Sequence, residues 1–390
     1  MADRLNRRAA LMLGVAGSLA LPGVVRAEPG VSGDRITFGQ SAAFAGPAAA
    51  LGLGMRQGIL AAFAEANVAG GVNGRRLELV SYDDGYEPER AIANSRRLID
   101  QDRVFALLGE VGTPTSKAAL PLATEVHVPF VGPFSGAPFL RDPALDNVVN
   151  VRASYDQETE AWVAHLTGDL GISRVALLYQ DDSFGLAGRS GLVKALAKRS
   201  MGLVAEGTYM RNTTAVKTAL LAIRSARPQA VGLVGTYAAC AEFVRLARRI
   251  GLDAVFVTLS FVGSDALARE LGKDGEGVVI TQVVPFPGDT DIPLVADYQR
   301  AVRSADPRAE LGFVSLEGYV VGRLVAQALA RTGEPPTRAG LLATVREVGT
   351  FDLGGFTLAY GPGDNRGSDR VFLTVIRADG SIAPVARLGA

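Results

Sequence analysis

From residue 35 onward, short apolar stretches rich in β-branched residues alternate with longer stretches in which apolar residues recur every three or four positions. The short stretches are typical of buried strands, and the longer ones predict amphipathic helices. In this first series, strands are expected at 36–39, 77–82, 104–108 and 128–131. Helices are expected at 54–68, 88–100 (with Pro88 at the start) and 116–125.

The alternation begins again after residue 152. This second series predicts strands at 174–179, 204–209, 230–234 and 255–259. Its helices are expected at 185–198, 216–226 and 238–250. Strands that alternate with helices form parallel sheets with helices on both faces. The sequence therefore predicts an α/β protein with two doubly wound parallel-sheet lobes.

More elements follow the second series. They are a strand at 278–282, helices at 292–304, 315–332 and 337–348, and a strand at 371–377. Because these elements must complete one or both lobes, we expect each lobe to be discontinuous in sequence. We assign residues 34–153 and 285–350 to lobe 1, and residues 154–284 and 351–390 to lobe 2. Several connections between the lobes favour a multi-strand hinge.

Residues 1–27 have the pattern of a secretory signal peptide. Arg4, Arg7 and Arg8 precede an apolar run from residue 9 to residue 25, and small residues follow at the expected cleavage site. The run is shorter than the roughly 20 residues of a spanning helix, so we favour a cleaved signal over an uncleaved anchor. The sequence thus predicts export to the periplasm by the Sec route or, because of the paired arginines, by the twin-arginine route.

Composition excludes some classes of partner. Of the 390 residues, 48% are hydrophobic and 21% are charged, which is typical of a globular protein with more than one domain. The 40 basic and 40 acidic residues cancel, so nothing indicates a nucleic-acid partner. Cys240 is the only cysteine and has apolar neighbours, so we expect a buried thiol and no internal disulfide.

No enzyme or cofactor motif is complete in this sequence. Gln57 stands where the dinucleotide-binding pattern beginning at Gly52 needs its third glycine. His127 and His165 lack partners at metal-ligand spacing, and no serine lies in a G-x-S-x-G elbow. We therefore expect no enzyme activity, no cofactor and no metal ion. An exported hydrolase stays as an alternative, because a catalytic triad can be assembled by the fold alone.

One candidate site lies where two neighbouring strands of the first series end. The segment 112–116 follows an apolar strand and precedes a helix, with Thr113 as the expected N-cap and Pro114 in the first turn. Free backbone N–H groups at such a helix start can bind an anion. The loop 132–138 follows the next strand, and together the two segments predict a carboxylate cradle. The alternative is that Thr113 only caps its own helix.

A set of short motifs, in a fixed order, indicates a family. They are Gly46-Pro47, Gly70–Arg75, Tyr82–Asp84, Val131–Pro138, Tyr179–Gly185 and Glu317–Tyr319. With these motifs the chain, from about Arg35 to its end, resembles the branched-chain amino-acid-type (Leu/Ile/Val-binding protein-like) substrate-binding proteins of ABC transporters. That family has the type I periplasmic binding fold, in which a ligand is held between two lobes.

The resemblance implies ligand contacts from both lobes. Lobe 1 would hold the ligand's carboxylate at a helix start and a strand-end loop, and lobe 2 would close over it with aromatic side chains. The corresponding positions are Thr113, Phe134, Gly136 and Leu51 in lobe 1, and Phe184, Tyr237 and Ser260 in lobe 2.

Three of these positions depart from the family pattern. Ser260 stands where an acidic residue would pair with an amino acid's ammonium group, Gly136 brings no hydroxyl, and Phe184 lacks the hydroxyl of the usual tyrosine. Because a buried ammonium without a carboxylate partner is costly, we expect a small, partly apolar carboxylate, with amino acids as the alternative. Asp182, Asp265 or Glu110 could supply the missing negative charge.

The expected function is that of a monomeric periplasmic receptor that delivers its ligand to the membrane permease of an ABC importer. The alternative within the same fold is a ligand-sensing receptor that signals to a partner protein. In both cases the ligand binds lobe 1 first, and hinge closure then excludes water.

Overall fold

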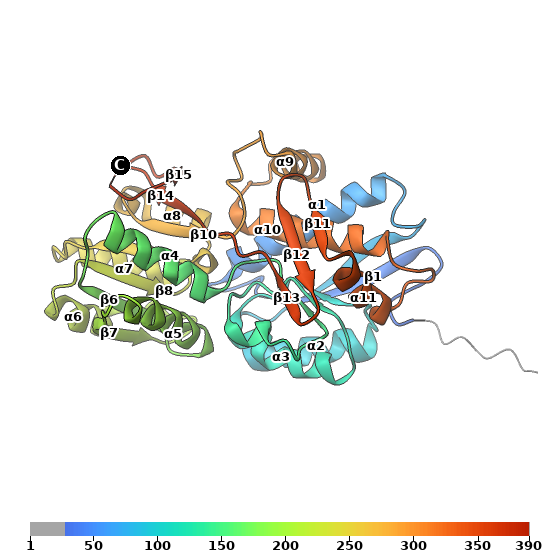
Figure 1. Ribbon diagram of the computed structural model, residues 1–390, viewed down its shortest axis with the longest axis horizontal. Coiled ribbons are helices and arrows are strands. Elements are labelled where there is room, and N and C mark those ends of the chain that lie inside the picture. The colour runs from blue at the N-terminus through green and yellow to red at the C-terminus, as the bar shows by residue number, and fades with distance from the viewer. Residues whose placement is uncertain (1–27, 390) are drawn as a thin grey trace, which may run out of the picture.

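The computed structural model describes residues 28–389, which form two lobes side by side (Figure 1). The predicted signal peptide, residues 1–27, lies outside the described residues. Within residues 28–389, no helix combines the length and the apolar character that a membrane span requires.

Lobe 1 is built on a five-stranded parallel sheet with the strand order β2-β1-β3-β4-β5. Its strands are β1 (Arg35–Ala42), β2 (Arg76–Asp83), β3 (Leu107–Leu108), β4 (Phe130–Val131) and β5 (Val148–Val149). The helices that cover it include three from the first series, α1 (Ala49–Val68), α2 (Pro88–Arg96) and α3 (Thr113–Glu125). Three more helices come from late in the chain: α9 (Pro293–Ala305), α10 (Phe313–Leu329) and α11 (Arg338–Val348). Of these, α9 and α10 pack against α1.

Lobe 2 contains a seven-stranded sheet with the order β15-β14-β10-β9-β8-β6-β7. Its strands are β6 (Val175–Gln180), β7 (Leu203–Tyr209), β8 (Ala230–Val234), β9 (Val255–Thr258), β10 (Val279–Gln282), β14 (Phe372–Ile376) and β15 (Ile382–Val385). Its helices are α4 (Tyr155–Gly168), α5 (Ser183–Ala197), α6 (Lys217–Ser225), α7 (Tyr237–Arg249) and α8 (Ser264–Leu271). The strands from β6 to β10 are parallel as predicted, but β14 and β15 form a hairpin that pairs antiparallel with β10.

A third, antiparallel sheet contains β11 (Thr350–Asp352), β12 (Thr357–Gly361) and β13 (Asp364–Gly367). The sequence assigned this segment to lobe 2, but the structure attaches it to lobe 1. The backbone N–H of Asn150 donates to the carbonyl of Asn365 at 2.8 Å, and the Tyr360 hydroxyl donates to the Asn150 carbonyl at 2.8 Å. These hydrogen bonds hold the small sheet beside β5, so the chain returns to lobe 2 only at β14.

The chain passes between the lobes at three places: between β5 and α4, between β10 and α9, and between β13 and β14. In Figure 1 these connections lie together at the waist of the molecule. The arrangement of two α/β lobes with a multi-stranded hinge confirms the predicted fold class. It also places the ends of β3, β4 and β5 opposite lobe 2.

Candidate ligand-binding site between the lobes

The structure places all seven predicted site residues, Leu51, Thr113, Phe134, Gly136, Phe184, Tyr237 and Ser260, in buried positions. They come from both lobes and lie along the boundary between them. Polar groups gather toward the hinge, and apolar groups fill the middle of the boundary.

The start of α3 differs in one respect from the sequence-based prediction. Gly112, with a φ of 112°, is the N-cap, and Thr113 is the first helical residue. The prediction that Thr113 is the N-cap is therefore wrong, because its backbone is already helical. Its side chain makes no capping hydrogen bond and turns toward the next strand-end loop.

Three hydroxyl groups meet at this helix start. The Thr113 Oγ1 atom lies 2.7 Å from the Ser135 Oγ atom and 3.3 Å from the Tyr155 hydroxyl oxygen. All three side chains are buried, and burial raises the pKa of the Tyr155 phenol although Arg152 and Thr113 oppose the increase. Because hydroxyls can donate as well as accept, this cluster can turn its donors toward a carboxylate placed beside α3.

Two backbone carbonyls of the loop after β4 already accept hydrogen bonds from neighbouring segments. The carbonyl of Phe134 accepts from the N–H of Gly112 at 3.3 Å, and the carbonyl of Gly136 accepts from the N–H of Tyr155 at 2.8 Å. A Cβ atom at Gly136 would lie only 2.5 Å from Cδ1 of the Tyr155 ring. Glycine at this position is therefore what allows Tyr155 to reach the hydroxyl cluster.

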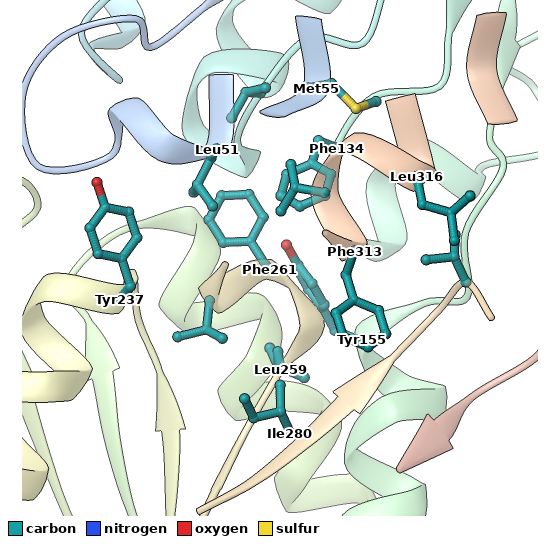
Figure 2. Packing of buried hydrophobic residues seen from close by; sticks show 14 of the residues in the cluster. Leu51, Met55, Phe134, Tyr155, Tyr237, Leu259, Phe261, Ile280, Phe313 and Leu316 are labelled. Carbon is teal, nitrogen blue, oxygen red and sulfur yellow. The ribbon is translucent and has the colours of Figure 1, made fainter. Parts of the chain in front are cut away.

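Aromatic rings from both lobes close the middle of the boundary. Phe261 of lobe 2 lies 5.2 Å, between ring centroids, from Phe134 of lobe 1 and 4.5 Å from Phe184 of lobe 2. The Tyr155 ring also packs against Phe184, with 5.5 Å between the ring centroids. Figure 2 shows Phe261 beside Phe134 and below Leu51, with the Tyr155 hydroxyl pointing toward these rings. Neither Phe261 nor Tyr155 was among the predicted site residues.

Next to these rings lies an open cleft of about 230 Å³, lined by α1, α8 and the start of α10. Leu51 lies at the border between the aromatic rings and this cleft. Tyr237 crosses the boundary nearby, where its hydroxyl accepts from the N–H of Ala50 at 3.4 Å. The cleft has an apolar wall from α1 and charged groups from Asp265, Arg269 and Glu310.

Ser260 lies on the hinge side of the rings and belongs to a buried ionic network. Its N–H and hydroxyl donate to Glu158 at 2.8 and 3.0 Å, and Thr281 donates to the same carboxylate at 2.6 Å. Arg152 donates to the Ser260 hydroxyl and lies 3.7 Å from Glu158. An acidic group therefore does lie behind Ser260, but three residues, Ser260, Thr281 and Arg152, already contact its carboxylate.

A second carboxyl group, that of Glu317 on α10, faces Arg152 from lobe 1. The distance from Arg152 Nε to Glu317 Oε1 is 3.6 Å, which is too long for a hydrogen bond. Burial raises the pKa of Glu317 to about 7; the guanidinium groups of Arg152 and Arg141 oppose the increase, and Glu158 adds to it. Near neutral pH this carboxyl is therefore only partly ionised.

The three acids proposed to supply a missing charge are engaged elsewhere. Asp182 caps α5 and pairs with Arg211 at 3.0 Å. Asp265 accepts from the first N–H of α10, that of Phe313, at 3.2 Å. Glu110 is 1% exposed, and burial followed by the nearby Asp84 holds its pKa well above the ordinary value, which favours the neutral acid.

Comparisons with known proteins decide the family. A model described as periplasmic binding protein matches residues 35–381 of the chain. The chain belongs to the periplasmic binding protein family. A Pseudomonas aeruginosa protein named leucine-, isoleucine-, valine-, threonine-, and alanine-binding protein is 24% identical over 336 residues, covering 83% of this chain and 86% of that one. A possible leucine/isoleucine/valine-binding protein from Rhodopirellula baltica has a solved structure with 41% identity and a TM-score of 0.87, covering 92% of this chain and 98% of that chain.

A second structure, of a substrate-binding periplasmic protein from Ralstonia solanacearum, is 29% identical with a TM-score of 0.83, over 90% of this chain and 99% of that one. The predicted resemblance is thus confirmed. Periplasmic binding proteins take up small-molecule ligands and work with ABC-type transport systems.

In this periplasmic binding protein, sequence reasoning missed the groups nearest to the hinge. These are Ser135, Arg152, Tyr155, Glu158, Phe261 and Glu317. One signal was available, because Glu317 is an acidic residue between Leu316 and Gly318 in an otherwise apolar part of α10. A charge at such a position needs a buried partner, although the sequence does not show which one.

Proposed function

We propose that this protein is the exported receptor of an ABC importer and binds a small carboxylate that lacks an ammonium group. The ligand lies between the lobes and is enclosed by hinge closure. The observation that carries the proposal is the cluster of three hydroxyls at the start of α3, formed by Thr113, Ser135 and Tyr155. A helix start also leaves its first N–H groups without partners in the helix, which favours an anion.

The carboxyl groups around the site argue against an amino acid. An ammonium group needs an ionised carboxylate within reach when it is buried. Glu158 is occupied by Ser260, Thr281 and Arg152, and Asp182 and Asp265 cap helices. Of the carboxyl groups that remain, Glu110 is fully buried with a raised pKa, and Glu317 is only partly ionised near neutral pH and already faces Arg152.

The apolar part of the ligand would lie against the aromatic rings and Leu51. Phe134, Phe184 and Phe261 offer ring faces and edges, and the cleft next to Leu51 gives room for a side chain. These surroundings favour a branched aliphatic or aromatic acid over a small polar one. Relatives are named for leucine, isoleucine and valine, whose side chains would suit the same apolar surface.

We propose that the protein is exported, because residues 1–27 have the charge and apolar pattern of a signal peptide. The permease of the importer is its proposed partner, and no enzyme activity is needed for this role. We propose that the receptor acts as a monomer that presents its closed form to the permease.

A matched set of three ligands tests the ligand class. L-leucine carries both a carboxylate and an ammonium, 4-methyl-2-oxopentanoate carries only the carboxylate, and L-leucinamide carries only the ammonium. We expect the oxo acid to raise the melting temperature of the mature protein most, and the same order is expected for phenylalanine, phenylpyruvate and phenylalaninamide. Stabilisation by leucine or phenylalanine without stabilisation by either oxo acid would show that the ligand class is wrong.

The Thr113→Ala variant tests the location of the site. We expect it to weaken binding of the stabilising acid by about 1–2 kcal/mol in calorimetry, because a hydrogen bond to a charged group is lost. Thr115→Ala is the matched control, since the Thr115 hydroxyl donates to the Val111 carbonyl at 2.6 Å and stays within its own helix start. Equal affinity in the Thr113→Ala variant and the wild type would place the ligand elsewhere.

A further inference from the structure

Arg152 occupies an unusual position for a cation. It follows β5 at the first passage between the lobes and its side chain is 0% exposed. Its guanidinium carbon lies 4.6 Å from the centre of the Phe134 ring, and its Nη2 group donates to Ser260. Arg152 therefore lies between two of the residues that the family resemblance assigned to ligand contact, one from each lobe.

The hydrogen-bonding capacity of this guanidinium is only partly used. Within residues 28–389, the Nε and Nη1 groups of Arg152 have no hydrogen-bond acceptor, and Glu317 Oε1 has no donor. A buried donor without a partner costs about 1–3 kcal/mol, and more when the group is charged. This arrangement of the lobes thus leaves strong donors buried where an anion could satisfy them.

Arg141 lies in the same region and offers a comparison, because its hydrogen bonds are all structural. It donates to the backbone carbonyls of Ser135, Ala137, Arg152 and Ala153, at distances from 2.9 to 3.4 Å. Its side chain is thereby fixed by the loop and the hinge. Arg152 has no such set of carbonyl partners, so the two arginines have different roles.

The charges around Arg152 also favour an anion. Arg152 is buried with two carboxyl groups, of Glu158 and Glu317, and the half-buried Arg141 adds a second guanidinium group to the cluster. Because the pKa of Glu317 is about 7, this carboxyl is largely protonated below neutral pH and the cluster then carries an excess of positive charge. A ligand carboxylate would remove that excess.

We propose that Arg152 pairs with the carboxylate of the bound ligand, which takes the place of Glu317 as the ionic partner of the guanidinium. This inference rests on the proposed function and names the residue that selects for an anionic ligand. The unpaired Nε and Nη1 groups of Arg152 would bind the carboxylate from the hinge side. The Thr113, Ser135 and Tyr155 hydroxyls would bind it from lobe 1.

The test compares four proteins in calorimetry with 4-methyl-2-oxopentanoate and phenylpyruvate. They are the wild type, Glu317→Gln, the double variant Arg152→Gln/Glu317→Gln, and Arg141→Lys as the control for loss of a neighbouring guanidinium. The double variant removes one positive and one negative charge together, so the network is not left with an extra buried charge. Circular dichroism and the melting temperature without ligand establish that each variant is folded.

We expect the two substitutions at the Arg152–Glu317 pair to act in opposite directions. The double variant should bind the acid about tenfold to hundredfold more weakly, because charge-assisted hydrogen bonds are lost. Glu317→Gln alone should bind it about twofold more tightly at pH 7 and about tenfold more tightly at pH 8, where ionised Glu317 competes most strongly in the wild type. Arg141 and Glu158 also face Glu317, but they are unchanged in both variants. Arg141→Lys should lower the melting temperature. It should show neither the weaker acid binding of the double variant nor the tighter, pH-dependent binding of Glu317→Gln.

The outcomes separate this inference from the proposed function. If the wild type binds either acid and the double variant binds it equally well, or if Glu317→Gln weakens binding, Arg152 is not the partner of the carboxylate and the proposed function stands. If the wild type binds neither acid, the ligand class is wrong and this role of Arg152 is rejected with it. Opposite effects of the two variants would not arise from a general loss of stability.

Discussion

Replacing Glu317 by glutamine removes a buried carboxyl whose pKa in the folded protein is about 7, against an ordinary value of 4.5. Between pH 4.5 and pH 7 the folded chain keeps a proton on this group that the unfolded chain releases. The free energy of unfolding therefore falls as the pH rises through that window. The stability linked to this proton is fully present below pH 4.5 and is lost once the pH exceeds 7.

The size of the effect follows from the two pKa values. The difference between them corresponds to about 3 kcal/mol, because one pH unit is worth about 1.4 kcal/mol for one proton. The free energy of unfolding of Glu317→Gln, minus that of the wild type, should therefore increase by about 3 kcal/mol from pH 4.5 to pH 8. All other titrating groups are common to both chains, so only those that interact with Glu317 can add to this difference.

Urea unfolding of the ligand-free proteins at pH 4.5, 6 and 8 measures this difference. Circular dichroism follows both lobes, and the fluorescence of Trp162, the single tryptophan, follows α4 beside the hinge. Glu89→Gln, on the exposed face of α2, is the matched control for loss of a carboxyl. A difference between Glu317→Gln and wild type that stays constant with pH would refute the account of the buried network.

Two further predictions concern closure and the shape of the site. Asp265→Asn removes a charge that caps α10 from across the lobes, so we expect it to disfavour the closed form by about 1 kcal/mol. Small-angle scattering of the ligand-free variant should show a larger radius of gyration than the wild type. An unchanged radius would mean that this contact does not hold the lobes together. Gly136→Ala places a Cβ atom against the Tyr155 ring, so we expect it to destabilise the protein by about 1–3 kcal/mol and to weaken acid binding. Thermal melts measure the stability and calorimetry measures the affinity. Wild-type values of both would show that Tyr155 can move without consequence.

Periodicity predicted the parallel cores of both lobes because buried strands and amphipathic helices have strong local patterns. It missed α4, whose start is marked by a capping box between Ser154 and Gln157 but whose apolar residues are few. It also missed the three short strands from Thr350 to Gly367, which are held to lobe 1 by hydrogen bonds to the backbone and side chain of Asn150 and to the carbonyl of Leu140. Such contacts depend on the tertiary structure and leave no periodic signal.

Residues of the site could be predicted only where a local sequence pattern marks them. Thr113 was selected because it begins a helix after a strand, although its side chain turned out to contact Ser135 and not to cap the helix. The network joins Arg152 and Glu158, which are near each other in sequence, to Glu317, which lies far away in the chain. Each of these residues alone resembles an ordinary charged residue, and only the fold shows that they share one buried space.

The buried network also explains why a ligand should control closure. When the lobes close without a ligand, two donor groups of Arg152 lose water and gain no acceptor, at a cost of about 1–3 kcal/mol for each. Packing of Phe261 on Phe134 and the cap that Asp265 gives to α10 act in the opposite direction. Because these terms oppose each other, the balance between the open and closed forms depends on whether an acceptor reaches Arg152. A carboxylate on Arg152 removes only the unfavourable term, and a ligand that binds one form better shifts the equilibrium toward it.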